Sequence, residues 1–281
     1  MKPASSVVLL TTLIGAGQGL FLALFFGQAT RDVAVLGSAI SLGLLAAGLL
    51  ASFFHLGRPE RAWRTAAMWR TSWLSREVIV LPAFMAAVGA WGLYPNPWTG
   101  WIGVSLALAL FVCTGMIYAC LKFLQEWHTP LTVINYTALG VASGLTLAAA
   151  LDPAYTHAAI VAGALAYAGR LASLVRNAGL RPKSTLATAI GVKHPRIAQI
   201  AQGAMGGSFN TREFFHGRPR EVVRAVRWAL LALVFPVPAL LLFAGEAGVA
   251  FLVQFAGLLA ERWYFFAEAK HPQNLYYQAI A

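Results

Sequence analysis

The stretch SVVLLTTLIGAGQGLFLALFFG, residues Ser6–Gly27, contains no aspartate, glutamate, lysine or arginine. A helix rises about 1.5 Å per residue, so this stretch is long enough to cross the roughly 30 Å hydrocarbon core of a bilayer. Across all 281 residues, 59% are hydrophobic and only 11% are charged, whereas a soluble domain has about 25% charged residues. The composition therefore predicts a membrane protein and excludes an ordinary soluble domain.

Seven further apolar stretches follow the first, so Ser6–Gly27 is predicted to be a span rather than a cleaved signal peptide. The seven are Val33–Phe54, Leu74–Leu93, Thr99–Cys120, Thr132–Leu151, Thr156–Val175, Val226–Gly245 and Gly248–Ala267. The sequence thus predicts an all-α integral membrane protein, with residues 1–281 forming one bundle of eight transmembrane helices.

Small residues and prolines predict how the spans pack and bend. Gly140 and Gly144 form a GxxxG pattern in the fifth span, and Gly15, Gly17 and Gly19 cluster in the first. Both sets predict close helix contacts, because small residues let backbones approach each other in lipid. Pro236-Val237-Pro238 predicts a kink in the seventh span.

The basic residues predict the orientation. With eight alternating spans, one side receives Lys2, the Arg58–Arg70 cluster, Lys122, the basic segment after the sixth span and Lys270, whereas the other receives only Arg31. Lysine and arginine accumulate in cytoplasmic loops, so both termini are predicted to be cytoplasmic, with the protein in the inner (cytoplasmic) membrane. This placement explains the net charge of +11, so binding to nucleic acid is not needed to account for it. An acidic docking partner stays an open alternative.

Residues 176–225, between spans six and seven, form a basic, glycine-rich segment outside the membrane. Its piece Ser208–His216 combines Arg212 with the aromatic run Phe214, Phe215 and His216. We predict that this piece is a docking surface for a partner protein. The alternative is a basic loop that lies on anionic lipid headgroups.

A quinone headgroup would suit the hairpin between spans two and three. His55 leaves the membrane on the side from which Glu77 re-enters it, and Arg61, Trp63 and Trp73 lie between or beside them. The histidine would hydrogen-bond a quinone carbonyl, the carboxylate would exchange protons, and the tryptophans, Trp69 included, would pack on the ring or sit in the interfacial belt. Alternatively His55 only caps a helix end.

The arginines of the same loop are predicted to face a partner. Arg58 and Arg64 flank the candidate quinone residues at the predicted cytoplasmic rim. There they would bind a partner subunit and raise the local positive potential. The alternative is that they only mark the topology.

Three charged residues lie within the sixth and eighth predicted spans, where each costs roughly 2.5–3.5 kcal/mol on insertion scales. They are Arg170 in the sixth span and Glu261 and Arg262 in the eighth. Neighbouring side chains point about 100° apart on a helix, so we expect Glu261 and Arg262 to find partners on other helices rather than each other, with Arg170 the candidate for Glu261. The open alternatives are a structural ion pair and a proton-accessible position near the quinone.

The sequence predicts no tightly bound redox metal. None of the six histidines lies centrally in a span, as a haem held between helices would require. Cys113 and Cys120 form neither a CxxC pair nor a ligand set for an iron–sulfur cluster. Any electrons would therefore come from or go to a partner subunit.

The loop after the second span resembles the dimethyl sulfoxide reductase anchor subunit family. Phe54-His55-Leu56-Gly57-Arg58-Pro59-Glu60-Arg61-Ala62-Trp63 and Leu74-Ser75-Arg76-Glu77 are similar to that family's motifs, and Ala256–Arg262 is similar to its closing helix. The resemblance implies a haem-free, eight-helix subunit that holds a molybdopterin catalytic subunit and an iron–sulfur subunit on the membrane. It also implies that His55 and Glu77 bind quinone.

Gly207–Glu213 and Glu261–Glu268 are similar to the branch of the family that anchors cytoplasmic sulfite dehydrogenases. This resemblance implies a complex of three subunits that oxidises sulfite and passes electrons to ubiquinone or menaquinone, with this subunit not catalytic toward sulfite itself. Three alternatives stay open: an anchor of a quinol-oxidising reductase of the dimethyl sulfoxide type, a structural anchor with no quinone site, and a secondary transporter. The transporter is disfavoured because no internal repeat is seen, although Arg170 and Glu261 are the intramembrane charges it would need.

Overall fold

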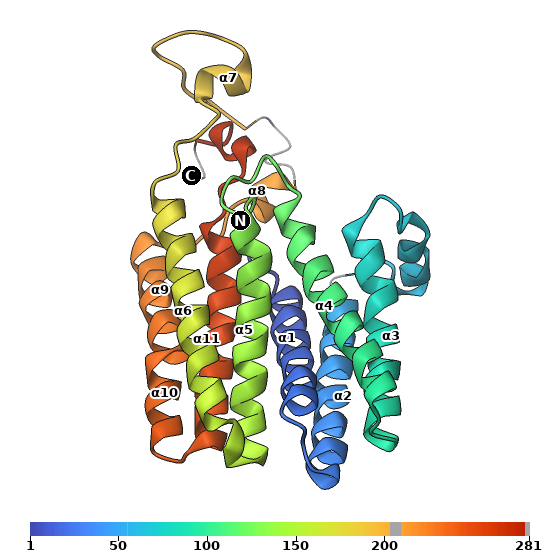
Figure 1. Cartoon of the computed structure of the whole chain (residues 1–281). Coiled ribbons are helices and arrows are strands. Elements are labelled where there is room, and N and C mark those ends of the chain that lie inside the picture. The colour runs from blue at the N-terminus through green and yellow to red at the C-terminus, as the bar shows by residue number, and fades with distance from the viewer. Residues whose placement is uncertain (55, 203–208, 279–281) are drawn as a thin grey trace.

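The computed structural model describes residues 1–54, 56–202 and 209–278, and this part of the chain contains helices but no β-strand. Eight segments are long and apolar enough to cross a membrane, which confirms the predicted all-α bundle (Figure 1). They are α1 (Ser5–Phe26), α2 (Arg31–Phe53), α3 (Trp73–Leu93), α4 (Pro97–Ala119), α5 (Pro130–Leu151), α6 (Thr156–Ala178), the pair α9 (Arg220–Val234) and α10 (Pro236–Phe243), and α11 (Ala247–Glu268). A short 3₁₀ turn, η2 (Pro153–Tyr155), leads into α6.

Local sequence signals set the ends and breaks of these helices. The Asn96 side chain accepts a hydrogen bond from the Thr99 amide at 3.0 Å, and Pro97 opens α4, as expected for an N-cap followed by a first-turn proline. The seventh span is divided at Phe235, which directly precedes Pro236. This break follows because proline lacks the amide hydrogen that continues a helix. It confirms the predicted kink.

Close contact between α1 and α5 holds the centre of the bundle. A Cβ atom added to Gly144 would overlap the backbone of Gly19, and one added to Gly19 would overlap the backbone of Gly140. The glycines of both helices therefore allow the approach that the sequence predicted. Hydrogen bonds tie α1 to two other spans as well: Gln18 Nε2 donates to the Ala107 carbonyl of α4 at 3.0 Å, and Ser41 Oγ of α2 donates to the Gly17 carbonyl at 2.8 Å.

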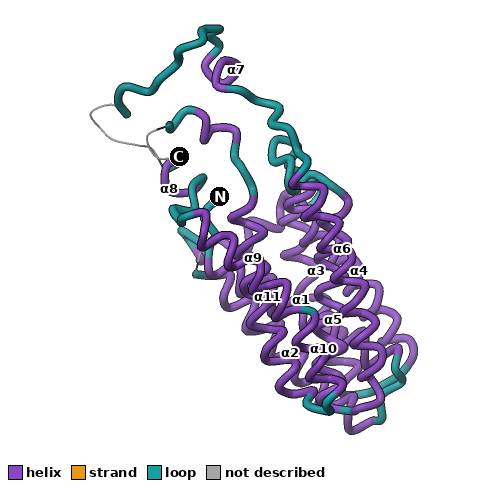
Figure 2. The backbone as a smooth tube through the Cα atoms, turned by 90° about the vertical axis from the view of Figure 1, so that its left-hand side faces the viewer, coloured by secondary structure: helices purple, strands orange, loops and turns teal. Residues whose placement is uncertain are grey.

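The two ends of the bundle differ (Figures 1 and 2). One end has only the short connections 27–30, 94–96, 152–155 and 244–246. The other end, called here the basic face, carries both described chain ends and all the longer connections. These hold η1 (Pro59–Met68), α7 (Leu186–Ile190), α8 (Asn210–Glu213) and η3 (Pro272–Leu275). The alternation of sides that the charge pattern required is therefore present in the structure.

Candidate functional site

Glu77 is a buried carboxylate just inside the basic face. It lies in the second turn of α3, whose start is capped by Ser72 Oγ accepting from the Ser75 amide at 3.3 Å. The residue is only 7% exposed, and it accepts a short hydrogen bond from Thr114 Oγ1 on α4. A carboxylate at this depth is costly, so a hydroxyl donor beside it stabilises its position between the two helices.

The connection 56–72, called here the α2–α3 loop, forms an exposed aromatic and basic surface above Glu77's helix. Trp63 is 71% exposed, and the Arg64 guanidinium lies 5.4 Å from its ring centroid. Arg76 at the start of α3 donates from Nε and Nη2 to the carbonyls of Trp69 and Arg70, both at 2.9 Å, and stacks 4.2 Å from Trp73. These contacts tie the loop to α3.

The predicted quinone residues divide into two groups. Glu77 lies inside the bundle, and Trp73 lies half-buried on the same helix against Arg76. Arg61 and Trp63 lie on the exposed loop instead, where Arg61 approaches Glu60 at 3.9 Å. His55 lies outside the described residues. In the sequence it stands between the end of α2 at Phe53 and the α2–α3 loop, which precedes the helix of Glu77.

A second group of charges is buried between α6 and α11. Arg170, Glu261 and Arg262 are each less than 5% exposed. Arg170 Nε lies 3.2 Å from Glu261 Oε1, which confirms the predicted pair, and Arg170 Nη2 lies 3.8 Å from Glu268 Oε2. The prediction that Glu261 and Arg262 would not pair is wrong, because Arg262 Nη1 lies 3.4 Å from Glu261 Oε2. An arginine side chain has several rotatable bonds, so two neighbouring residues of one helix can still pair.

Arg262 also meets an aromatic ring on α5. Its guanidinium lies 3.7 Å from the Tyr136 ring centroid, a cation–π distance that is favourable in a desolvated site. Beside it, Asn135 Nδ2 donates to Ser173 Oγ at 2.6 Å. A cavity of about 10 Å³ lies among these groups and has the size of about one water molecule.

Aromatic residues connect the two buried polar groups. Tyr118 lies one turn beyond Thr114 on α4 and stacks on Tyr136 with centroids 5.6 Å apart. Trp127 Nε1 donates to the Phe265 carbonyl at 3.0 Å and closes the cluster from the side. Sequence reasoning missed Thr114, Tyr118 and Tyr136. The spacing of Thr114 and Tyr118, four residues apart in an apolar span, was the available signal of a polar helix face.

The predicted docking piece 208–216 packs partly against the chain itself. Ser208 lies outside the described residues. The Phe214 ring stacks on His271 at 3.6 Å, Asn274 Nδ2 donates to the Phe214 carbonyl at 3.0 Å, and Phe215 faces Tyr277 with centroids 6.3 Å apart. Burial, and then the nearby N-terminal ammonium group, lower the pKa of His216. Of the six predicted docking residues, Arg58, Arg64 and Arg212 are exposed, whereas Phe214, Phe215 and His216 are half-buried.

Within residues 1–54, 56–202 and 209–278, no group of three or more His, Cys, Asp or Glu side chains is arranged to hold a metal ion. Cys113 is buried and Cys120 is exposed, and both are free thiols. The polar chemistry of the described part of the chain therefore lies in Glu77 with its α4 partner, the buried charges of α6 and α11, and the basic face.

Comparison with known proteins places these features in a family. Residues 3–267 match the family model of the DMSO reductase anchor subunit (DmsC). The chain is also 54% identical to a sulfite dehydrogenase subunit of Allochromatium vinosum, and the alignment covers 100% of both chains. A match over nearly the whole length includes all eight spans. The chain therefore belongs to the DMSO reductase anchor subunit (DmsC) family.

Proposed function

We propose that this protein is the membrane anchor and quinone-reactive subunit of a complex with an iron–sulfur subunit and a molybdopterin catalytic subunit. In this role it passes electrons between the iron–sulfur subunit and the quinone pool. The family match supports the anchor role, and the name of the 54% identical relative favours sulfite as the substrate of the catalytic subunit. Electrons would then flow from sulfite to quinone, rather than from quinol to a reductase.

The basic face is proposed to be cytoplasmic, in the inner membrane, with both termini on that side. The support is the distribution of charge: the long connections at this face carry the basic residues, and Arg31 stands alone at the opposite end. The exposed Arg58, Arg64 and Arg212 would meet the iron–sulfur subunit there. Aromatic side chains of the α2–α3 loop, such as Trp63, would bury surface in the same contact, as is common at interfaces.

The single observation that carries the quinone proposal is the buried Glu77 carboxylate, held by Thr114 beneath the basic and aromatic α2–α3 loop. A bound quinone supplies reversible two-electron, two-proton chemistry. Glu77 would hold or move a proton at its carboxyl oxygens, and Thr114 would orient that carboxyl group. His55 would hydrogen-bond a quinone carbonyl, Trp73 would pack beside the ring, and Arg61 and Trp63 would border the approach to the site. Ubiquinone and menaquinone fit this chemistry equally.

The test is quinone-linked sulfite oxidation by the intact complex in its native membrane. We expect Glu77→Gln and His55→Ala to lose about 10²-fold or more in rate, the scale of a general acid–base contribution. Glu60→Gln is the matched control, because it removes an exposed carboxylate from the α2–α3 loop. Retention of the two partner subunits is followed by immunoblotting, and their activity with an artificial electron acceptor is measured in the same membranes.

Each outcome has a distinct meaning. Loss of quinone-linked transfer with the partners bound and active supports the site at Glu77. Unchanged transfer in both variants would disprove the site and leave an anchor that binds quinone elsewhere or not at all. Loss of the partner subunits in His55→Ala alone would assign that residue to assembly.

A further inference from the structure

An open groove lies at the basic face between α6 and α9. The span formed by α9 and α10 contacts α6 through α10, whereas α9 packs on α11. α6 and α9 therefore pack on each other little at this end, and α11 lies beside them (Figure 1). The resulting cavity has a volume of about 1010 Å³ and is lined by Leu174 and Asn177 of α6, Val223 and Arg227 of α9, and Tyr264 of α11.

Cationic side chains line the upper part of this groove. Arg220, Arg224 and Arg227 are spaced four and three residues apart on α9, so they share one helix face. Together with Val223 and Tyr264 they line a hollow of about 270 Å³. Arg218 and Lys270 also border the groove.

Few acidic groups oppose these cations. Glu126 and Glu268 line the groove, and Glu268 already faces Arg170 at 3.8 Å. Arginine binds phosphate well, because its planar donor fork matches two phosphate oxygens at once. The charge of the groove therefore favours a phosphate-bearing ligand.

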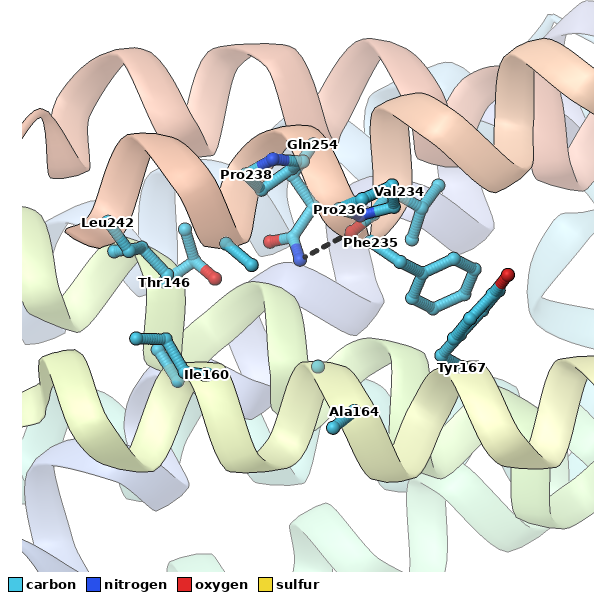
Figure 3. Close-up of a pocket in the computed structure, with 13 residues that line it drawn as sticks. Thr146, Ile160, Ala164, Tyr167, Val234, Phe235, Pro236, Pro238, Leu242 and Gln254 are labelled. Carbon is cyan, nitrogen blue, oxygen red and sulfur yellow. Dashed lines mark hydrogen bonds between the residues drawn. The ribbon is translucent and has the colours of Figure 1, made fainter. Parts of the chain in front are cut away.

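A second, apolar hollow lies deeper along the same seam (Figure 3). It has a volume of about 190 Å³ and lies between Ile160, Ala164 and Tyr167 of α6 and Pro238 and Leu242 of α10. Thr146 and Gln254 also line it, and Gln254 Nε2 donates to the Val234 carbonyl at 3.2 Å. The lining is thus suited to hydrocarbon.

The distance between the arginine-lined hollow and the apolar hollow matches the distance between the phosphate and an acyl chain of one lipid. Seven residues separate Tyr167 from Leu174 on α6, and seven separate Arg227 from Val234 on α9. Seven residues of helix span about 10 Å. A ligand whose phosphate lies among the arginines would reach the apolar hollow with the middle of an acyl chain.

We propose that this groove is a binding site for an anionic glycerophospholipid, with the phosphate on Arg220, Arg224 and Arg227 and one acyl chain in the α6–α10 hollow. A neutral quinone headgroup would leave three guanidinium groups without a counter-charge, and free phosphate would leave the hollow unfilled. Basic pockets between membrane helices on the cytoplasmic side bind lipid headgroups in this way. The bound lipid would fill the space between α6 and α9 and stabilise the connection 214–220. This proposal does not depend on the quinone site.

The test measures lipid retained by the purified complex in mild detergent. We expect wild type to retain about one phosphatidylglycerol or cardiolipin per chain in native mass spectra. Arg224→Gln/Arg227→Gln should weaken retention about tenfold or more, because it removes two charge-assisted hydrogen bonds to the phosphate. Ala164→Phe, which fills the apolar hollow, should weaken retention as well. Arg181→Gln/Arg196→Gln is the matched control, because it removes two exposed cations from the basic segment and should leave retention unchanged.

A second measurement identifies the ligand. Phosphatidylglycerol added to delipidated wild type should raise the melting temperature, whereas phosphatidylcholine, ubiquinone and inorganic phosphate should raise it less or not at all. The proposal is overturned if Arg224→Gln/Arg227→Gln, eluting as a monodisperse complex, retains as much lipid as wild type. It is also overturned if inorganic phosphate or ubiquinone stabilises as well as phosphatidylglycerol, or if the control pair loses lipid equally.

Discussion

Glu261 is a single carboxylate shared by two buried guanidinium groups, Arg170 on α6 and Arg262 on its own helix. Removing its charge leaves both arginines dependent on Glu268 and on the Tyr136 ring. Breaking a buried pair by deleting one partner destabilises by about 3–5 kcal/mol. We therefore expect Glu261→Met to lower the free energy of unfolding by about that amount, measured by denaturant titration of the purified protein in detergent micelles.

The matched comparison is Arg170→Met/Glu261→Met, which removes one positive and one negative charge together and leaves Arg262 and Glu268. Apolar replacement of a whole buried pair is often nearly neutral, so the double variant should be more stable than Glu261→Met alone. If the double variant were the less stable of the two, the pair would not be the source of the effect.

At the scale of residues, the sequence predicted that a buried charge needs a partner, but it did not predict which partner a long side chain can reach. A charge in lipid is costly, and this alone led to the pairing of Arg170 with Glu261. Helix geometry suggested that Arg262 would point away from Glu261, yet rotation about the arginine side-chain bonds brings the two together at 3.4 Å. The Thr114 hydroxyl beside Glu77 depends on how α3 packs on α4, which no local pattern encodes.

Among the helices, the contact of α1 with α5 depends on the absence of a side chain at Gly144. Alanine normally favours a helix over glycine by about 1 kcal/mol, but a Cβ here would overlap the backbone of Gly19. Overpacking typically costs about 1–3 kcal/mol, so Gly144→Ala should lower the melting temperature in detergent. Gly43→Ala on α2 is the control, because an added Cβ there meets nothing within 4 Å, and it should be neutral or stabilising.

The contact between the 209–218 connection and the chain's tail should depend on pH. Burial, followed by the N-terminal ammonium group, lowers the pKa of both His216 and His271 below the ordinary 6.5. Each Nδ1 accepts a backbone hydrogen bond, from Arg218 and Gln273 respectively, and protonation removes that acceptor. The undocked state therefore binds more protons, so docking is favoured above pH 6.5 and is lost as pH falls through the lowered values.

Hydrogen-exchange protection factors for residues 209–218 measure this docking. They should fall between about pH 8 and about pH 5, on either side of the ordinary histidine pKa. His216→Asn/His271→Asn keeps a side-chain acceptor but does not titrate, so its protection should change little over the same range. An unchanged pH dependence in that variant would show that other groups control the contact.

Spans and connections differed in how far the sequence could predict them. Each span followed from an uncharged or nearly uncharged apolar run, and the division at Phe235 followed from the prolines after it. Residues 179–219 have no such pattern, so α7 and α8 were not predicted. The stacking of Phe214 on His271 joins positions far apart in the chain, and this is why a piece predicted to dock a partner is half-buried by the protein's own tail.

For the whole molecule, the placement of polar groups at one end has an energetic consequence. Glu77 in the second turn of α3, the α2–α3 loop and the exposed Arg58, Arg64 and Arg212 all lie at or just inside the basic face. If the iron–sulfur subunit docks there and the quinone exchanges protons there, neither electrons nor protons cross the bilayer. Moving one charge across it would involve about 2.3 kcal/mol per 100 mV, so a pathway confined to one face neither builds nor uses a membrane potential.

We therefore expect the complex in quinone-containing proteoliposomes to turn over without generating a potential. A voltage-sensitive dye should stay at baseline during sulfite oxidation, and an uncoupler should leave the rate unchanged. A potassium diffusion potential imposed with valinomycin in the same vesicles is the control that the dye responds and the membranes are sealed. A dye signal that grows with turnover and collapses with uncoupler would mean that protons reach the quinone from the opposite face, and it would refute the one-sided arrangement while leaving the anchor role intact.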